Sequence, residues 1–295
     1  MSALPVPRTP IARLHQPRTD VSPFVRAFIV RDTRGSLLAG DDLLNRFPAS
    51  LHCVLTWFLE GEADMVHSAG QQAGMRLSGC VVSGCHTQPV TSRSRGDVHA
   101  FMVMFHPDAF HALFGTDLAP LQNRFVDVKD VLPAHGLALV DAVFAARSDA
   151  ARQALVERFV LEHATVRPLS AWLRIRRMSQ HVTLGLASRM LGIGPRQLQR
   201  LALREVGANL QTLVRLRRGE RSFLQAQRRV VRNAPLNLAD HALANDYADQ
   251  SHLARECKAQ TGRTPLQLLR DVQREEADWV YRLEFADDAD ASDAA

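Results

Sequence analysis

Two segments in the C-terminal part of the chain hold arginine and glutamine side chains at helical spacing. The first contains Arg196, Gln197, Gln199, Arg200 and Arg204. The planar guanidinium of arginine can donate two parallel hydrogen bonds to a phosphate or to a guanine, which lysine does less well. Such residues on the exposed side of a helix are typical of a surface that contacts nucleic acid.

The second segment contains Gln250, Ser251, His252 and Arg255. These residues follow Asp249, whose carboxylate can accept hydrogen bonds from backbone N–H groups at the start of a helix. The polar residues therefore lie in the first turns of the predicted helix. Both segments fit the second helix of a helix-turn-helix unit, which enters the major groove.

Charge is distributed unevenly along the chain. Residues 167–282 contain 21 basic and 10 acidic residues, a formal charge of +11, whereas the remainder contains 15 basic and 21 acidic residues, a charge of −6. All basic residues except Lys129 and Lys258 are arginine. A basic block joined to an acidic remainder indicates that one half of the protein meets a polyanion.

The first predicted helix-turn-helix unit covers residues 184–205. A helix from Leu184 to Leu191 should stop at Gly192, and Pro195 fits the first turn of the next helix, which Gly207 ends. The apolar residues of that helix form one stripe, opposite the arginines and glutamines: Leu198, Leu201, Ala202 and Val206.

The second predicted unit covers residues 238–261. Its first helix runs from Leu238 to Ala244, its turn contains Asn245 and Asp246, and its second helix ends at Gly262. Residues 209–232 form one long helix between the units. If both units bind one face of DNA, their second helices should enter successive segments of the major groove about 34 Å apart.

The N-terminal half has a strand-like pattern followed by helices. Short β-prone runs at 24–30, 51–59, 80–84 and 99–105 are separated by turn residues, which predicts a sandwich or barrel. Helical patterns follow at 108–115, 135–147 and 149–163.

At these motifs the sequence resembles the AraC/XylS family of transcription regulators. The residues that carry the resemblance are GPRQLQR (194–200), REVGANLQTLVRLRR (204–218) and YADQSHLARECKAQTGRTP (247–265). The turn glycine of the family's second unit is Asp246 here. Aromatic core residues of the family are replaced by Leu253, Cys257 and, in the first unit, Ala202. Large-to-small core changes cost about 2–5 kcal/mol when nothing fills the space, so either neighbours such as Leu203 and Phe223 fill it or the domain is marginally stable.

The resemblance implies roles for the polar residues of both units. It places base contacts at Arg196, Gln199 and Arg200, and at Gln250, Ser251 and Arg255, with His252 nearer the backbone or core. Contact of Arg200 or Arg255 with phosphate alone is the alternative. The implied partners are double-stranded promoter DNA, RNA polymerase, a small-molecule effector that the sequence does not identify, and a second copy of the chain.

The stretch at 82–115 resembles more loosely the cupin-type sensor domain of the same family. The predicted fold class is therefore α+β in two domains: an N-terminal cupin-like β-barrel with flanking helices and an all-α domain of two helix-turn-helix units joined by a long helix. The predicted boundaries are a poorly ordered start at 1–20, a sensor and dimerisation domain at 21–165, a DNA-binding domain at 168–282 and a disordered acidic tail at 286–295.

The main alternative is a metal-dependent cupin-type enzyme fused to a DNA-binding module. The candidate ligands are His52, His67, His86, His99, His106 and His111, but the chain has no His-x-His motif. Cys85 adjoins His86, yet adjacent strand residues face opposite ways. A second alternative is a helical adaptor that binds protein rather than DNA, which the charge of +11 disfavours.

The sequence thus predicts a regulator without catalytic residues or cofactor. Cys53, Cys80, Cys85 and Cys257 form no zinc-binding pattern and are expected to be reduced, mostly buried thiols. No stretch reaches the roughly 20 apolar residues that a membrane helix needs, and the N-terminus lacks a signal-peptide pattern. We therefore expect a soluble, cytoplasmic protein.

Overall fold

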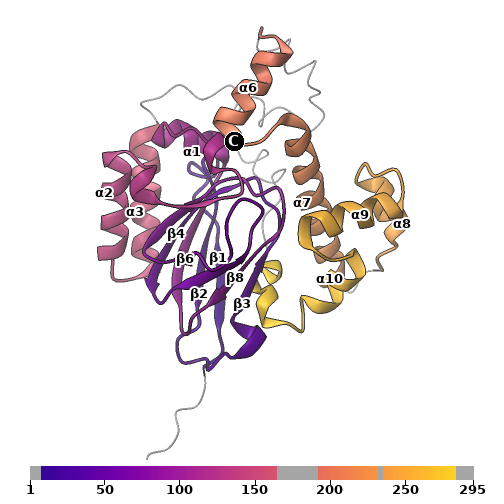
Figure 1. Cartoon of the computed structure of the whole chain (residues 1–295), viewed down its shortest axis with the longest axis horizontal. Helices are drawn as coiled ribbons and strands as arrows, with labels where there is room; N and C mark the ends of the chain where they lie inside the picture. The colour runs from indigo at the N-terminus through magenta and orange to yellow at the C-terminus, as the bar shows by residue number, and fades with distance from the viewer. Residues whose placement is uncertain (1–7, 165–191, 232–234, 284–295) are drawn as a thin grey trace, which may run out of the picture.

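The computed structural model describes residues 8–164, 192–231 and 235–283. Strands fill the centre of the molecule, three helices cover one side of them, and the C-terminal helices lie at the top and on the opposite side (Figure 1). This two-part α+β arrangement agrees with the predicted order of a strand-rich half followed by a helical half. Within the described ranges, no helix is both long and apolar enough to cross a bilayer.

The larger sheet has six antiparallel strands in the order β1-β2-β9-β4-β7-β10. β2, β4, β7 and β9 correspond to the four predicted strands, whereas β1 and β10 were not predicted. β1 pairs with β2 along its whole length, so residues 11–15 are ordered and the prediction of a poorly ordered start is wrong there. The bounds are β1 Ile11–His15, β2 Val25–Asp32, β4 Cys53–Glu60, β7 Cys80–Ser83, β9 His99–Phe105 and β10 Phe125–Asp127.

The smaller sheet has four antiparallel strands in the order β3-β8-β5-β6. Phe47 and Met65 of this sheet pack with Phe58 and Phe125 of the larger sheet, so apolar side chains join the two. The bounds are β3 Leu44–Phe47, β5 Ala63–His67, β6 Arg76–Leu77 and β8 Val90–Ser94.

The predicted closed barrel is corrected to two separate sheets. No ladder of backbone hydrogen bonds joins the described strands of one sheet to those of the other. The chain crosses between the sheets in loops, and β6, at the edge of the smaller sheet, has only two residues. A barrel needs continuous pairing around its circumference, which this arrangement lacks.

Three helices cover the outer face of the larger sheet. They bury the apolar side of β2, β4 and β9, including Phe28, Leu55 and Phe101, and form the largest core of the protein. Their bounds are α1 Pro107–Phe114, α2 Ala134–Ala145 and α3 Asp149–Ala164, close to the predicted ranges. Short 3-10 helices occur at η1 Gly40–Leu43, η2 Ala119–Leu121 and η3 Val128–Asp130.

The C-terminal part is helical, as predicted. Its elements are α6 Pro195–Val206, α7 Leu210–Val231, α8 Leu238–Ala244, α9 Gln250–Thr261, α10 Pro265–Asp271 and the 3-10 segment η4 Glu276–Arg282. The predicted first helix of the first unit, 184–191, and the predicted acidic tail, 286–295, lie outside the described residues.

Candidate nucleic-acid interface

The second helix of the first unit is α6, and it begins and ends as its sequence predicts. Gly194 is the N-cap and Pro195 occupies the first turn. Leu198, Ala202 and Val206 are buried. Gly207 ends the helix with φ +75°, and a Cβ at this position would lie 3.0 Å from the carbonyl oxygen of Leu118. Glycine therefore satisfies both the left-handed conformation and the close approach of the N-terminal half.

The second unit also follows its predicted pattern. Asn237 caps α8, and its side chain accepts a hydrogen bond from the N–H of Ala239 at 2.9 Å. Asp249 caps α9 by accepting from the N–H of His252 at 2.7 Å. Tyr247, between the two helices, is buried against Ala242 and Leu253. Local sequence chemistry thus fixes both ends of the candidate recognition helix.

The structure exposes nearly all of the predicted DNA-contacting side chains. On α6 the exposed residues are Arg196, Gln197, Gln199, Arg200 and Arg204, and on α9 they are Gln250, Ser251 and Arg255. Arg204 pairs with its neighbour Glu205 at 3.2 Å. Arg196, Arg200 and Arg255 make no ion pair with another described residue, so their guanidinium groups are available to a ligand.

His252 differs from the other predicted site residues because it is half-buried and held within its own unit. Its Nδ1 accepts a hydrogen bond from the N–H of Ala248 at 3.3 Å, which leaves Nε2 as the donor to Glu256, also at 3.3 Å. Glu256 accepts a 2.6 Å hydrogen bond from Arg218 of α7. The resemblance had placed His252 nearer the backbone or core, and this geometry makes it a residue that positions α9.

Arg218 and Arg221 of α7 stabilise the turn of the second unit, and the sequence analysis did not single them out. Asp246 has φ +60°, a conformation that costs a non-glycine residue about 1–2 kcal/mol. Its carboxylate pairs with Arg221 at 2.6 Å, and its carbonyl accepts from Arg218 at 3.1 Å. These contacts explain how aspartate replaces the family's turn glycine. The feature of the sequence that could have indicated these contacts is the set of arginines on the long helix, which comes before a turn that contains an aspartate.

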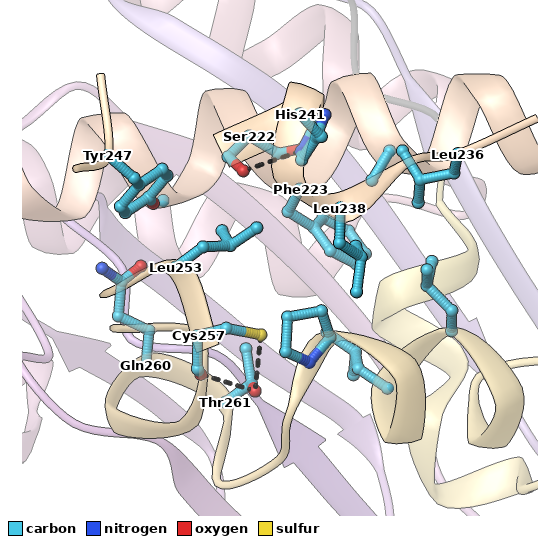
Figure 2. A pocket seen from close by; sticks show the side chains of 15 residues that line it. Ser222, Phe223, Leu236, Leu238, His241, Tyr247, Leu253, Cys257, Gln260 and Thr261 are labelled. Carbon is cyan, nitrogen blue, oxygen red and sulfur yellow. Dashed lines mark hydrogen bonds between the residues drawn. The ribbon is translucent and has the colours of Figure 1, made fainter. Parts of the chain in front are cut away.

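A pocket lies at the centre of the second unit, between α7, α8, α9 and α10 (Figure 2). Leu253 and Cys257, which replace aromatic residues of the family pattern, line it together with Phe223. Its volume is about 50 Å³. Phe223 packs with Cys257 at this pocket, whereas Leu203 of the first unit is 40% exposed and does not fill the space beside Ala202. The replacements are thus only partly compensated.

The long helix α7 joins the two units. Its 22 residues span about 33 Å at 1.5 Å per residue. The side chain of Asn209 accepts a hydrogen bond from Thr212 N–H at 2.8 Å at its start. The second unit packs along α7 rather than at its far end, since Gln260 donates to the carbonyl of Arg215 and Arg218 donates to Glu256, so the length of α7 is not the distance between α6 and α9.

The candidate residues for metal binding or catalysis are not arranged for either. No group of three histidine, cysteine or acidic side chains that could hold a metal occurs among the residues that the structure describes. Burial raises the pKa of the Cys85 thiol to about 12 and lowers the pKa of His86 to about 4. Cys85 is therefore a protonated thiol, which is a poor nucleophile. All four cysteines are free, and three are buried.

Two family models match this chain. One, described as a helix-turn-helix domain, matches residues 187–271, and the other, described as a domain of unknown function (DUF6597), matches residues 13–127. No curated protein matches the chain.

Solved structures with a similar arrangement have low sequence identity. An apo single-substitution variant of ToxT from Vibrio cholerae strain SCE256 has a TM-score of 0.46 and 11% identity, covering 82% of this chain and 97% of that one. ToxT from Vibrio cholerae O395 bound to (E)-4-(8-methylnaphthalen-1-yl)but-3-enoic acid has a TM-score of 0.44 and 10% identity, covering 77% and 97%. The AraC-like transcriptional activator CuxR has a TM-score of 0.26 and 14% identity, covering 66% and 76%.

The assignment depends on the C-terminal domain rather than on these distant structures. The helix-turn-helix match spans both recognition helices, and the sequence between 247 and 265 carries the AraC-type motif. Residues 187–271 therefore form a helix-turn-helix domain whose sequence is similar to that of AraC-type transcription regulators.

Proposed function

We propose that the regulator recognises a two-part DNA site through base contacts from both recognition helices. The observation that supports this most strongly is the exposure, near the start of α6 and α9, of arginines without an ion pair to any described residue: Arg196, Arg200 and Arg255. Arginine can form two hydrogen bonds with guanine O6 and N7, and glutamine can do so with adenine N6 and N7. Gln199, Gln250 and Ser251 supply the remaining base contacts in this proposal, and Gln197 and Arg204 contact the backbone.

Selection of bound DNA from a random pool tests this proposal. The expected result is a consensus with two conserved parts whose centres are about 10 base pairs apart, one helical turn. Recovery of sequences without a consensus would show that the arginines contact only phosphate. A salt titration of the selected site should show a log–log slope of about −0.9 per neutralised phosphate, whereas a protein-binding adaptor would show no such DNA affinity.

We propose that residues 21–165 form the sensor and dimerisation domain and residues 168–282 the DNA-binding domain. The two sheets would then be an open variant of the cupin-like barrel, in which an effector or a partner changes the placement of the DNA-binding helices. Hydrogen bonds between the two halves support this kind of regulation. The N–H of Leu118 donates to the carbonyl of Arg204 at 2.8 Å, and the N–H of Ala49 donates to the carbonyl of Gln260 at 2.8 Å. A thermal-shift screen of the full chain against small molecules tests for an effector.

Dimerisation is proposed through the outer faces of α2 and α3. These faces expose mainly small or apolar residues, including Ala138, Phe144, Ala151 and Ala154. Such a face can pack against a second copy around a two-fold axis. Sedimentation at micromolar concentration should show a dimer that Phe144→Asp converts to a monomer, with Arg147→Asp as the control on a nearby exposed position. A monomeric wild-type protein would contradict the proposal.

A further inference from the structure

Residues 275–283 cross back from the second unit onto the smaller sheet, and we call this segment the C-terminal strap. At its centre Trp279 is 2% exposed. Its indole N–H donates to the side-chain oxygen of Asn45 on β3 at 2.9 Å, and its ring meets Phe47 edge-on with centroids 5.7 Å apart. The strap is therefore docked by packing and by a buried hydrogen bond.

Arginines of the N-terminal sheets hold the same segment by charge. Arg31 of β2 is buried, donates to Glu276 at 2.6 Å and lies over the Trp279 ring at 5.1 Å. Burial lowers the pKa of Arg31, which its hydrogen bond to Glu276 opposes. Arg46 of β3 pairs with Glu275 and lies 3.6 Å from Asp278.

The opposite side of the strap belongs to the second unit. Asp278 is 0% exposed, and both of its oxygens accept hydrogen bonds from Arg263, at 2.5 and 2.6 Å. Arg263 follows Gly262 at the end of α9. Gln227 of α7 donates to the carbonyl of Tyr281 at 2.7 Å. Asp278 is thus shared between β3 and the end of the recognition helix.

These contacts hold the second unit against the N-terminal sheets, and in this arrangement α9 is oriented differently from α6. Figure 1 shows α6 standing upright and α9 lying across the view, so the two helices are not parallel. One full turn along a straight DNA duplex, the major groove has the same orientation and is displaced only along the helix axis. Two helices that dock alike in successive turns must therefore be parallel, which this arrangement does not provide.

We propose that the C-terminal strap is an autoinhibitory contact that holds the second unit against the smaller sheet, and that binding of both units to one duplex requires its release. The inference rests on the proposed two-part DNA site. Buried ion pairs suit such a device, because desolvation offsets much of their Coulomb energy while their geometry fixes one arrangement. The strap can thus specify an orientation without binding irreversibly.

The first test is the double variant Asn45→Ala/Arg46→Ala in the full chain. It removes the polar contacts that Asn45 and Arg46 of β3 make with the strap. Asp278 stays paired with Arg263, so the second unit keeps its own contacts. Affinity for the selected two-part site should increase at least about fivefold, while affinity for DNA carrying only the part bound by the first unit stays unchanged. Arg95→Ala is the control, because Arg95 follows β8 of the same sheet and its exposed pairs are with Glu62 and Asp64 rather than with the strap.

A second measurement uses the unmodified protein, so that it does not depend on folding of a variant. Hydrogen exchange of residues 275–283 should become faster when the two-part DNA binds. Unchanged or slower exchange, or unchanged or weaker DNA affinity in the folded double variant, would overturn the inference. If the wild-type protein selects no DNA consensus, the proposed two-part site fails instead, and the two failures are therefore distinguishable.

Discussion

The two helix-turn-helix units are attached to the N-terminal half by different chemistry. The first unit rests on apolar contacts: Leu51 and Cys85 pack with Leu198, Ala202 and Val206. Its polar contacts with the N-terminal half involve backbone carbonyl groups, such as the 2.7 Å hydrogen bond from the side chain of Gln122 to the carbonyl of Gly207. The second unit is attached through the strap, which combines arginine–carboxylate pairs with the packing of Trp279 and Leu283 against Ile29 and Met102.

Both units expose arginines without an ion pair to a described residue, Arg196 and Arg200 on α6 and Arg255 on α9, but only α9 has a predicted site residue in a charge network with α7. That residue is His252, which belongs to a network with Glu256 and Arg218. The stability of the first unit, which is held by packing, should depend on side-chain volume and on whether a buried neutral group becomes charged. The second unit, which is held partly by ion pairs, should be sensitive to the removal of one partner of such a pair. This contrast predicts separate ways to perturb each unit.

The largest expected effect is an acid sensitivity beneath the first unit. His86 is buried, and neither ring nitrogen has a hydrogen-bond partner among the described residues. Its pKa is lowered from 6.5 to about 4, so the unfolded chain binds a proton more readily than the folded protein in this window. The free energy of unfolding should be undiminished above about pH 6.5 and fall by up to about 3 kcal/mol as the pH approaches about 4.

Urea unfolding at several pH values measures this effect. His86→Leu should remove the corresponding part of the pH dependence, whereas substitution of the exposed His67 by leucine should retain it. Equal slopes for wild type and His86→Leu between pH 6.5 and about 4 would show that His86 is accessible to protons in the folded state.

Arginine substitutions on the two recognition helices come next in expected size. Arg200→Ala and Arg255→Ala should each weaken binding to the selected site by about 1–3 kcal/mol, or about 5- to 150-fold, and relax preference at one base pair. Each change should affect only the part of the site bound by its own unit. Arg147→Ala, an exposed change of equal charge outside both units, is the control. Equal losses on cognate and random DNA would assign the residue to phosphate contact.

Two substitutions that enlarge a core side chain, one in each unit, allow the packing of the two units to be compared. Leu253 lines the pocket of the second unit, so Leu253→Phe should stabilise the protein by about 1 kcal/mol by filling it. Leu198 of the first unit is fully buried, and Leu198→Phe should destabilise by about 1–3 kcal/mol through overpacking. Urea unfolding midpoints give both values. Destabilisation by both substitutions would mean that the pocket cannot accept a larger ring.

The smallest expected effects concern the two turns. Gly192 has φ +64°, so Gly192→Ala should cost about 1 kcal/mol of backbone strain. Asp246→Gly relieves similar strain but loses the half-exposed pair with Arg221, which is worth about 0.5 kcal/mol. Its net effect should therefore lie within about 0.5 kcal/mol of zero. A larger loss in Asp246→Gly would show that the Arg221 pair stabilises the turn more than strain opposes it.

Local elements of the second unit were predictable because their signals lie within a few residues of each other. Asn237 and Asp249 cap α8 and α9, and Thr264 opens α10 with a capping box. The central strands were predictable for the same reason, since apolar runs of strand length mark them. β1 and β3 were missed because polar residues interrupt them, and only pairing with β2 and β8 makes them strands.

The sequence by itself determined the helix-turn-helix class of the C-terminal domain, the positions of α6 and α9 and the side chains that they expose, because capping, turn chemistry and helical periodicity act over short distances. Only the tertiary structure decided that the sheets stay separate, that Arg218 and Arg221 support the Asp246 turn, and that Asp278 joins β3 to the end of α9. Arg46 and Asp278 are 232 positions apart, and no local pattern indicates that the chain returns to bring their charges together. Such long-range pairs depend on the packing of the whole molecule, because residues far apart in the sequence meet only once the sheets and helices have packed.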